Sequence, residues 1–152
     1  MDQLPSIDLT ADQEATLRSI AKDAYANWKV NATPEAQAAG VAQMEKFVND
    51  PAYGEAEMAK CARQFTECDV NGDGRLNREE YLAFMAVQME NAREEGAWVE
   101  PMPSLFTRSY DMYNTMSEEE GVDYNQFLAC SGKYYEYFEE YKGADEAAAA
   151  GQ

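Results

Sequence analysis

The chain has 152 residues, of which 45% are hydrophobic and 12% aromatic, so it is too apolar for a disordered protein and long enough for one domain or two small lobes. Its 29 acidic side chains outnumber the 12 basic ones, and the net charge of −17 argues against nucleic acid and anionic membrane surfaces as partners. The same charge favours metal cations and basic peptides, whereas the absence of histidine removes the usual zinc ligand and the commonest general base.

The first 50 residues predict two helices joined by a short connection. Thr10 is a good N-cap, and apolar residues recur at helical spacing behind it, which indicates a helix over 11–29. Thr33 followed by Pro34 marks the start of a second helix. Its apolar stripe consists of Val41, Met44, Phe47 and Val48. The short connection between the two helices lacks the acidic residues that a metal-binding loop needs. We therefore interpret 1–50 as a vestigial N-terminal helix pair, that is, a helix-loop-helix unit without a metal site.

Residues 51–142 predict a second unit with four further helices. The third helix leads into an acidic loop at 69–80, and the fourth begins at the end of that loop. Two prolines then indicate a linker, after which the fifth and sixth helices flank a second loop at 114–126. The last residues, 143–152, predict a flexible tail. With about six helices and no long strand, the expected fold class is all-α.

The loop at 69–80 reads D-V-N-G-D-G-R-L-N-R-E-E and satisfies the spacing D-x-[DN]-x-[DN]-G-x5-E, which is typical of calcium-binding loops. Calcium is a hard cation that takes about six to eight oxygen ligands. The pattern supplies them through the side chains of Asp69, Asn71 and Asp73, the backbone carbonyl of Arg75, Asn77 directly or through a water, and both carboxylate oxygens of Glu80. We therefore predict a Ca²⁺ site in this loop, with the cationic Arg75 side chain pointing to solvent.

Two further positions of this loop have structural roles. Gly74 is at the sixth position, where the chain turns sharply in a conformation that is costly for a residue with a Cβ. Leu76, at the eighth position, is apolar within an otherwise polar loop. Three carboxylates and two amides are a moderate set of ligands, which predicts an affinity of about 10⁻⁷–10⁻⁵ M and weak competition from Mg²⁺.

On these residues, the segment 54–93 resembles an EF-hand of the calmodulin, troponin C and parvalbumin superfamily. The resemblance implies EF-hand helix-loop-helix pairs, Ca²⁺ as the ligand and a paired second hand. In such pairs the eighth loop residue, here Leu76, forms a short β-bridge with its counterpart in the other loop. We expect Val122 to be that counterpart.

The loop at 114–126 is the expected second hand, but its ligand positions are degenerate. Asn114 takes the place of the first Asp, and Gln126 takes the place of the closing Glu. An amide cannot supply two anionic oxygens, so the closing ligand is lost. The three glutamates at 118–120 leave two interpretations open, a solvated loop or a weak ion site, of which we favour the solvated loop.

Two classes of function compete for such a chain. In the first it is a single-site regulatory subunit, sensor or light-chain-like, in which Met85 and Met89 border a groove for a protein partner. That partner is a basic amphipathic helix or a component of a cytoskeletal or ciliary assembly. In the alternative, the chain is a calcium buffer or a constitutive structural subunit in which Ca²⁺ only stabilises the fold. Tyr137 falls off the main apolar stripe of its helix. Apolar surface around Tyr137 and Trp98 therefore fits a permanent docking site for a partner in this second class.

Neither an enzyme nor a membrane protein is expected. The chain has no nucleophile motif and no glycine loop for phosphate. No apolar run approaches the roughly 20 residues that span a bilayer, and the acidic start lacks the features of a signal peptide. We therefore expect a cytoplasmic protein, with the cytoskeleton and the cilium as candidate sites, and no nucleic-acid partner.

Overall fold

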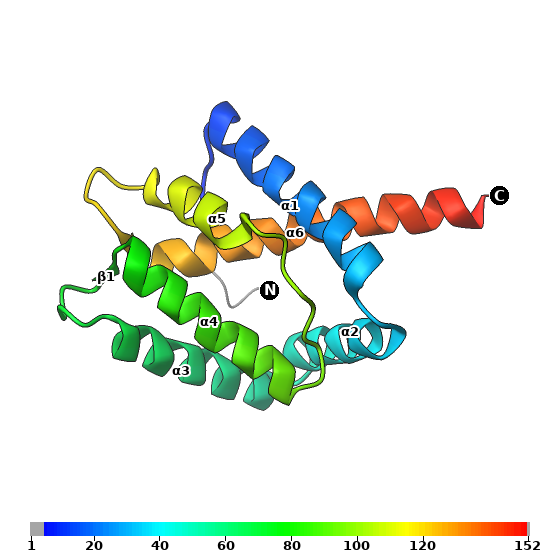
Figure 1. Ribbon diagram of the computed structural model, residues 1–152, viewed down its shortest axis with the longest axis horizontal. Helices are drawn as coiled ribbons and strands as arrows, with labels where there is room; N and C mark the ends of the chain where they lie inside the picture. Colours follow the sequence, from blue (N-terminus) through cyan, green and yellow to red (C-terminus); the bar gives the residue numbers. More distant parts are fainter. Residues whose placement is uncertain (1–4, 152) are drawn as a thin grey trace.

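A computed structural model of the chain describes residues 5–151 and shows six helices and one pair of short strands in that range (Figure 1). The helices are α1 (Ala11–Asn31), α2 (Pro34–Asn49), α3 (Pro51–Cys68), α4 (Arg78–Glu94), α5 (Leu105–Asn114) and α6 (Tyr124–Ala150), and the strands are β1 (Arg75–Leu76) and β2 (Val122–Asp123). The predicted all-α fold with a short β-bridge is confirmed. Within 5–151, no helix combines the length and the apolarity needed to cross a membrane.

Local capping explains where the first three helices begin. At the start of α1, Thr10 Oγ1 accepts a hydrogen bond from the Gln13 N–H, and Gln13 Oε1 accepts one from the Thr10 N–H. Thr33 and Asp50 cap α2 and α3, and each is followed by a proline at the first helical position. As a result α3 begins directly after α2, with a single residue between them.

The two strands join the two loops. β1 and β2 are antiparallel, with Arg75 opposite Asp123 and Leu76 opposite Val122. The Leu76 and Val122 side chains are fully buried, so the expected bridge is present. Gly121 precedes β2 with a φ of 104°, and a Cβ at this position would lie 3.0 Å from the Leu76 carbonyl oxygen. The close approach of the two loops therefore requires glycine here.

An aromatic core joins the helices that flank the loops. The Phe84 ring of α4 packs edge to face on Phe65 of α3 and Phe127 of α6, with ring centroids 5.4 and 5.0 Å apart. Tyr81 is buried beside them, and its hydroxyl is 2.9 Å from Ser109 Oγ of α5. These four helices thus share one core, and both loops emerge from the same end of it (Figure 1).

The two N-terminal helices pack on different parts of the molecule. α1 lies along α6 and α5 and buries Leu17 and Ile20, whereas α2 packs against α3 (Figure 1). The two N-terminal helices therefore have different main neighbours within the described residues. The stripe predicted on α2 stays partly exposed, at 38% for Val41 and 50% for Val48.

The long helix α6 continues to Ala150 and so includes most of the segment 143–152, which the sequence predicts as a flexible tail (Figure 1). Asp145 anchors this part to α1, because its Oδ2 accepts hydrogen bonds from the Tyr25 hydroxyl and the Lys29 ammonium group, both at 2.6 Å. Burial and the Asp145 carboxylate raise the pKa of Tyr25 to about 12, so the phenol remains a donor at neutral pH. These hydrogen bonds tie the end of α6 to α1.

The aromatic residues of α6 also face differently from the expectation. Tyr137 is buried rather than available for docking, and the Arg18 guanidinium of α1 lies 4.0 Å above its ring centroid. Tyr135, at 44%, is the exposed large aromatic residue of this helix. The reason is that α1 covers the side of α6 that carries Tyr137, and the sequence of α6 alone does not reveal this neighbour.

Candidate metal centre

The candidate Ca²⁺ loop, 69–80, connects α3 to α4 and contains β1. Asp69 is the C-cap residue of α3, and Asn77 is the N-cap residue of α4. The residue at the first loop position therefore ends α3, and the residue at the ninth position begins α4. Because the helices are packed in the aromatic core, the core fixes where these two side chains lie.

The Asp69 carboxylate has one oxygen with a protein partner and one without. Oδ2 accepts a hydrogen bond from the Gly74 N–H at 2.7 Å, which folds the loop back on its own start. Oδ1 is buried and has no hydrogen-bond partner. Every other buried side-chain oxygen or nitrogen among residues 5–151 has one. A buried charged oxygen without a partner is destabilising, so a cation beside this atom would be stabilised.

The middle of the loop consists of turns. Gly72 and Gly74 have φ angles of 69° and 80°, a region that residues with a Cβ rarely adopt, and Gly74 thus makes the sharp turn expected of it. Asp73 Oδ1 accepts a hydrogen bond from the Arg75 N–H at 3.0 Å. Asn71 and Asp73 are both exposed at the rim of the loop.

The Glu80 side chain is buried and ties the two ends of the loop together. Its Oε2 accepts a hydrogen bond from the Val70 N–H at 2.8 Å, and its Oε1 accepts one from the Asn77 N–H at 2.9 Å. Asn77 Oδ1 in turn accepts from the Glu80 N–H at 2.9 Å, which completes a capping box for α4. A carboxylate has about four lone-pair sites, so both Glu80 oxygens keep acceptor capacity.

The structure places all six predicted ligands in one loop but does not gather their charged groups. Within 5–151, no three Asp, Glu, Cys or His side chains lie together in a way that could hold a metal ion. One feature of the loop contributes to this, because Asp73 turns one carboxylate oxygen towards the backbone and accepts from the Arg75 N–H. The unpartnered Asp69 oxygen is thus the structural observation that points to a cation.

The sequence predicts that the Arg75 side chain points to solvent, but in the structure it does not. It is only 14% exposed and crosses to the second loop, where it forms an ion pair with Asp123 at 3.4 Å. Its guanidinium also donates hydrogen bonds to the carbonyl oxygens of Glu119, Glu120 and Gly121 and to Gln126 Oε1. The prediction is wrong because Arg75 lies in β1, and the pairing of β1 with β2 places these oxygens opposite it.

The second loop, 114–126, is also closed by hydrogen bonds of its own. Asn114 Oδ1 accepts from the Gly121 N–H at 2.7 Å, and Gln126 Oε1 accepts from the Asp123 N–H at 3.1 Å. Asp123 Oδ1 caps α6 by accepting from the Gln126 N–H at 2.7 Å. The two amides that replace the expected acids therefore close this loop, while the glutamates at 118–120 are exposed.

A thiol borders the first loop but does not belong to its donor set. Burial raises the pKa of the Cys68 thiol, and the carboxylates of Glu67 and Glu80 raise it further. The thiolate is the form that binds metals, and these surroundings disfavour it. The available donors in the loop are therefore oxygen atoms, which are the ligands of hard cations such as Ca²⁺.

Comparison with known proteins identifies no relative. No family model matches the chain, and no curated protein or solved structure matches it either. The resemblance of the 69–80 loop to an EF-hand therefore rests on its own residues.

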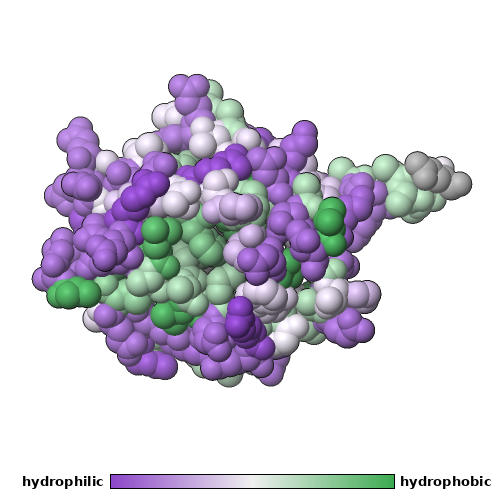
Figure 2. Space-filling view, viewed as in Figure 1, coloured by the Kyte–Doolittle hydropathy of each residue, from purple (hydrophilic) through white to green (hydrophobic). Residues whose placement is uncertain are grey.

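An apolar groove with a volume of about 530 Å³ lies between α4 and α6, and α2 forms part of its border. Hydrophobic side chains gather in the middle of this face of the molecule (Figure 2). The predicted Met85 and Met89 both line the groove, together with residues that the sequence analysis did not place there, such as Met44, Met58, Phe106 and Phe138. The partly exposed stripe on α2 is the signal that points to this wider groove.

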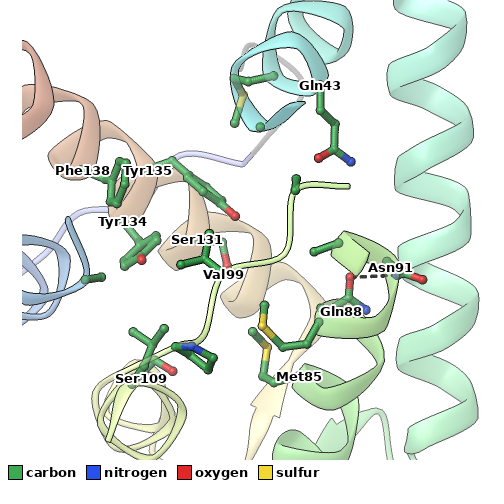
Figure 3. Close-up of a pocket in the computed structure, with 18 of the residues that line it drawn as sticks. Gln43, Met85, Gln88, Asn91, Val99, Ser109, Ser131, Tyr134, Tyr135 and Phe138 are labelled. Carbon is green, nitrogen blue, oxygen red and sulfur yellow. Dashed lines mark hydrogen bonds between the residues drawn. The ribbon is translucent and has the colours of Figure 1, made fainter. Parts of the chain in front are cut away.

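The linker between α4 and α5 crosses the groove. Figure 3 shows Val99 between Met85 of α4 and the Tyr134 and Phe138 rings of α6. Met102 of the same linker also lines the groove, whereas Trp98 lies beside Arg93, whose guanidinium is 4.5 Å from the ring centroid. The groove is therefore partly covered by a segment of the same chain.

Proposed function

We propose that the chain binds one Ca²⁺ ion in the 69–80 loop in the manner of an EF-hand. The observation that carries this proposal is the buried Asp69 Oδ1, which has no hydrogen-bond donor beside it. Carboxylate oxygens are ligands that calcium prefers, and the spacing of the loop makes Asp69 the first ligand. In a chain with a net charge of −17, a divalent cation also relieves repulsion among the acidic side chains.

The proposed ligands are the side chains of Asp69, Asn71, Asp73, Asn77 and Glu80 and the backbone carbonyl of Arg75. Glu80 is held by the backbone at both ends of the loop. Asn71 and Asp73 are exposed, so they are the members that adjust when the ion binds. This adjustment is inexpensive because an exposed side chain changes rotamer at little cost, and it reconciles the proposal with carboxylates that are not gathered in the structure.

In this proposal the second loop supports the first and takes no Ca²⁺ ion. Its strand β2 pairs with β1, and the buried Leu76 and Val122 side chains fasten the two loops together. Gln126 offers a single neutral oxygen where calcium loops supply a bidentate carboxylate. The chain therefore has one site, and a single site excludes cooperativity between sites.

We further propose that the protein is a regulatory subunit, sensor or light-chain-like, which binds a protein partner in its apolar groove. Methionine and aromatic walls suit the apolar face of an amphipathic helix. The net charge of −17 selects a basic helix. We place this partner in a cytoplasmic assembly, with the cytoskeleton and the cilium as candidates, and assign the chain no catalytic role.

A second candidate function is a calcium buffer or a constitutive structural subunit. The covered groove favours it, since Val99 and Met102 already occupy part of the surface that a partner would need. The direct hydrogen bonds between the loops, such as Arg75 to Gly121 at 2.8 Å, favour it as well. In this case Ca²⁺ stabilises the fold and opens nothing.

Calorimetric titration with CaCl₂, combined with the fluorescence of a hydrophobic dye, tests both functions. We expect one ion per chain with a dissociation constant of about 10⁻⁷–10⁻⁵ M. A large Ca²⁺-dependent rise in dye fluorescence supports the regulatory subunit. Stoichiometric binding with an unchanged dye signal rejects it in favour of the structural role.

Two variants test the site itself. Glu80→Gln removes the bidentate ligand and is expected to abolish Ca²⁺ binding. Glu79→Gln makes the same change of charge at the exposed neighbouring position and is expected to bind like the unmodified chain. If Glu80→Gln still binds one ion with unchanged affinity, the 69–80 loop is not the site.

A further inference from the structure

Arg75 is unusually enclosed for a charged residue at the surface of a loop. Its side chain is 14% exposed, whereas the other cations that form ion pairs within residues 5–151 are 33–58% exposed. It belongs by sequence to the first loop, but its guanidinium makes its contacts with the second. This arrangement needs an explanation other than solvation of a charge.

All three guanidinium nitrogens donate to oxygen atoms of residues 119–126. Nη2 lies 2.8 Å from the Gly121 carbonyl oxygen, 2.9 Å from Gln126 Oε1 and 3.3 Å from the Glu119 carbonyl oxygen. Nε lies 3.2 Å from the Glu120 carbonyl oxygen, and Nη1 lies 3.4 Å from Asp123 Oδ2 and 3.7 Å from Glu119 Oε2. Backbone carbonyls, an amide and carboxylates thus surround one positive group.

Such a set of oxygens is the kind that coordinates a hard metal ion. Here the positive charge is a single one, spread over a planar group with five N–H donors. A monovalent cation requires fewer acids than Ca²⁺, and this agrees with neutral amides at Asn114 and Gln126. These substitutions look like losses when judged against a calcium loop, but they fit a loop that surrounds an arginine.

We propose that the second loop is a cation site whose resident cation is the Arg75 guanidinium of the first loop. The chain thus fills one of its paired loops with its own side chain. The site is specific for a cation with several donors in one plane, and it accepts a divalent ion only after the arginine side chain is removed. This inference holds whether or not the first loop binds Ca²⁺.

The test removes Arg75 in a chain whose first loop cannot bind. In the Glu80→Gln background, Arg75→Ala is expected to bind one Ca²⁺ ion per chain, in the weak range of about 10⁻⁴–10⁻³ M. Arg78→Ala in the same background is the matched control, because it removes one positive charge from an exposed arginine three residues away that pairs with Asp111. The control and the Glu80→Gln parent are expected to bind none.

Equilibrium dialysis gives the stoichiometry, and NMR shifts of the backbone amides show which loop responds. Changes confined to 114–126 in the Arg75→Ala chain support the proposal. A folded Arg75→Ala chain that binds no Ca²⁺ overturns it, as does equal binding by the Arg78→Ala control. If the unmodified chain fails to bind Ca²⁺, the proposed function fails, while this comparison keeps its meaning.

A measurement on the unmodified chain covers the case in which Arg75→Ala does not fold. The Nε–H proton of Arg75 is expected to exchange with water at least about tenfold more slowly than that of Arg78, since it is bonded to the Glu120 carbonyl oxygen and the Arg75 side chain is only 14% exposed. Equal exchange rates for the two arginines overturn the proposal.

Discussion

The carboxylate of Glu80 accepts a hydrogen bond from the backbone N–H of Val70 at 2.8 Å, so the last residue of the 69–80 loop is tied directly to its second residue. Glu80 also accepts from the Asn77 N–H, which means that one side chain holds the entrance and the exit of the loop. The loop is therefore partly organised by its own hydrogen bonds.

This tie predicts that Glu80 contributes to stability in calcium-free solution. Glu80→Ala leaves the Val70 and Asn77 N–H groups without their partner and is expected to lower the free energy of unfolding by about 1–3 kcal/mol. Urea denaturation in the presence of a chelator measures this change in the free energy of unfolding. Glu79→Ala, at an exposed position, is expected to stay within about 0.5 kcal/mol of the unmodified chain. Equal stability of the two variants would contradict the tie.

The bridge between the loops predicts a larger effect for Leu76. Leu76→Ala creates a cavity against Val122 and is expected to cost about 2–5 kcal/mol. It should also weaken Ca²⁺ binding, because β1 no longer holds the Arg75 carbonyl in place. Val70→Ala, in the same loop but 83% exposed, is the control for both urea denaturation and calorimetry. A loss of stability without any loss of affinity would separate the bridge from the site.

The anchor of α6 predicts a dependence on pH. Hydrogen bonds from Lys29 and Tyr25 lower the pKa of Asp145 below its usual 3.8. A carboxylate whose folded pKa is depressed stabilises the fold above its unfolded pKa, and this contribution is lost as the pH falls through the folded value. We expect Asp145→Asn to remove this stabilising contribution at neutral pH, because the variant has no carboxylate to accept the two hydrogen bonds as an anion. Faster amide exchange confined to 143–150, absent in a Glu146→Gln control, would show it.

The linker in the groove predicts the behaviour of Val99. Val99→Ser removes apolar cover from the Met85 and Phe138 side and is expected to raise the fluorescence of a hydrophobic dye in calcium-free solution. Val48→Ser, at a half-exposed position outside the groove, is the control. If both variants bind the dye equally, Val99 does not cover the groove.

Much of the fold could be predicted from local signals. Thr10 and Thr33 mark helix starts that the structure reproduces, since caps and proline positions act through neighbouring backbone groups. The pairing of Leu76 with Val122 is not a local signal, and it is expected only because the 69–80 loop resembles one member of a pair of EF-hands. The helical end of α6 also has a local signal, because its run of alanines strongly favours helix.

Features that depend on a distant neighbour could not be predicted in this way. The stripe of α1 shows that Leu17 and Ile20 are buried but does not show that α6 and α5 cover them. Tyr137 is buried for the same reason. The direction of the Arg75 side chain depends on carbonyl groups some 45 residues later in the chain, so a pattern confined to 69–80 carries no information about it.

The linker that crosses the groove sets a limit on any partner. Val99 and Met102 line that groove, so a helix that enters it competes with a segment of the same chain. The apparent dissociation constant is the intrinsic one divided by the fraction of molecules in which the groove is free. If about one molecule in a hundred is free, the partner binds about a hundredfold more weakly than its contacts allow. In the proposed regulatory subunit, the linker length and sequence would thus set the partner concentration needed for a response, independently of the groove walls.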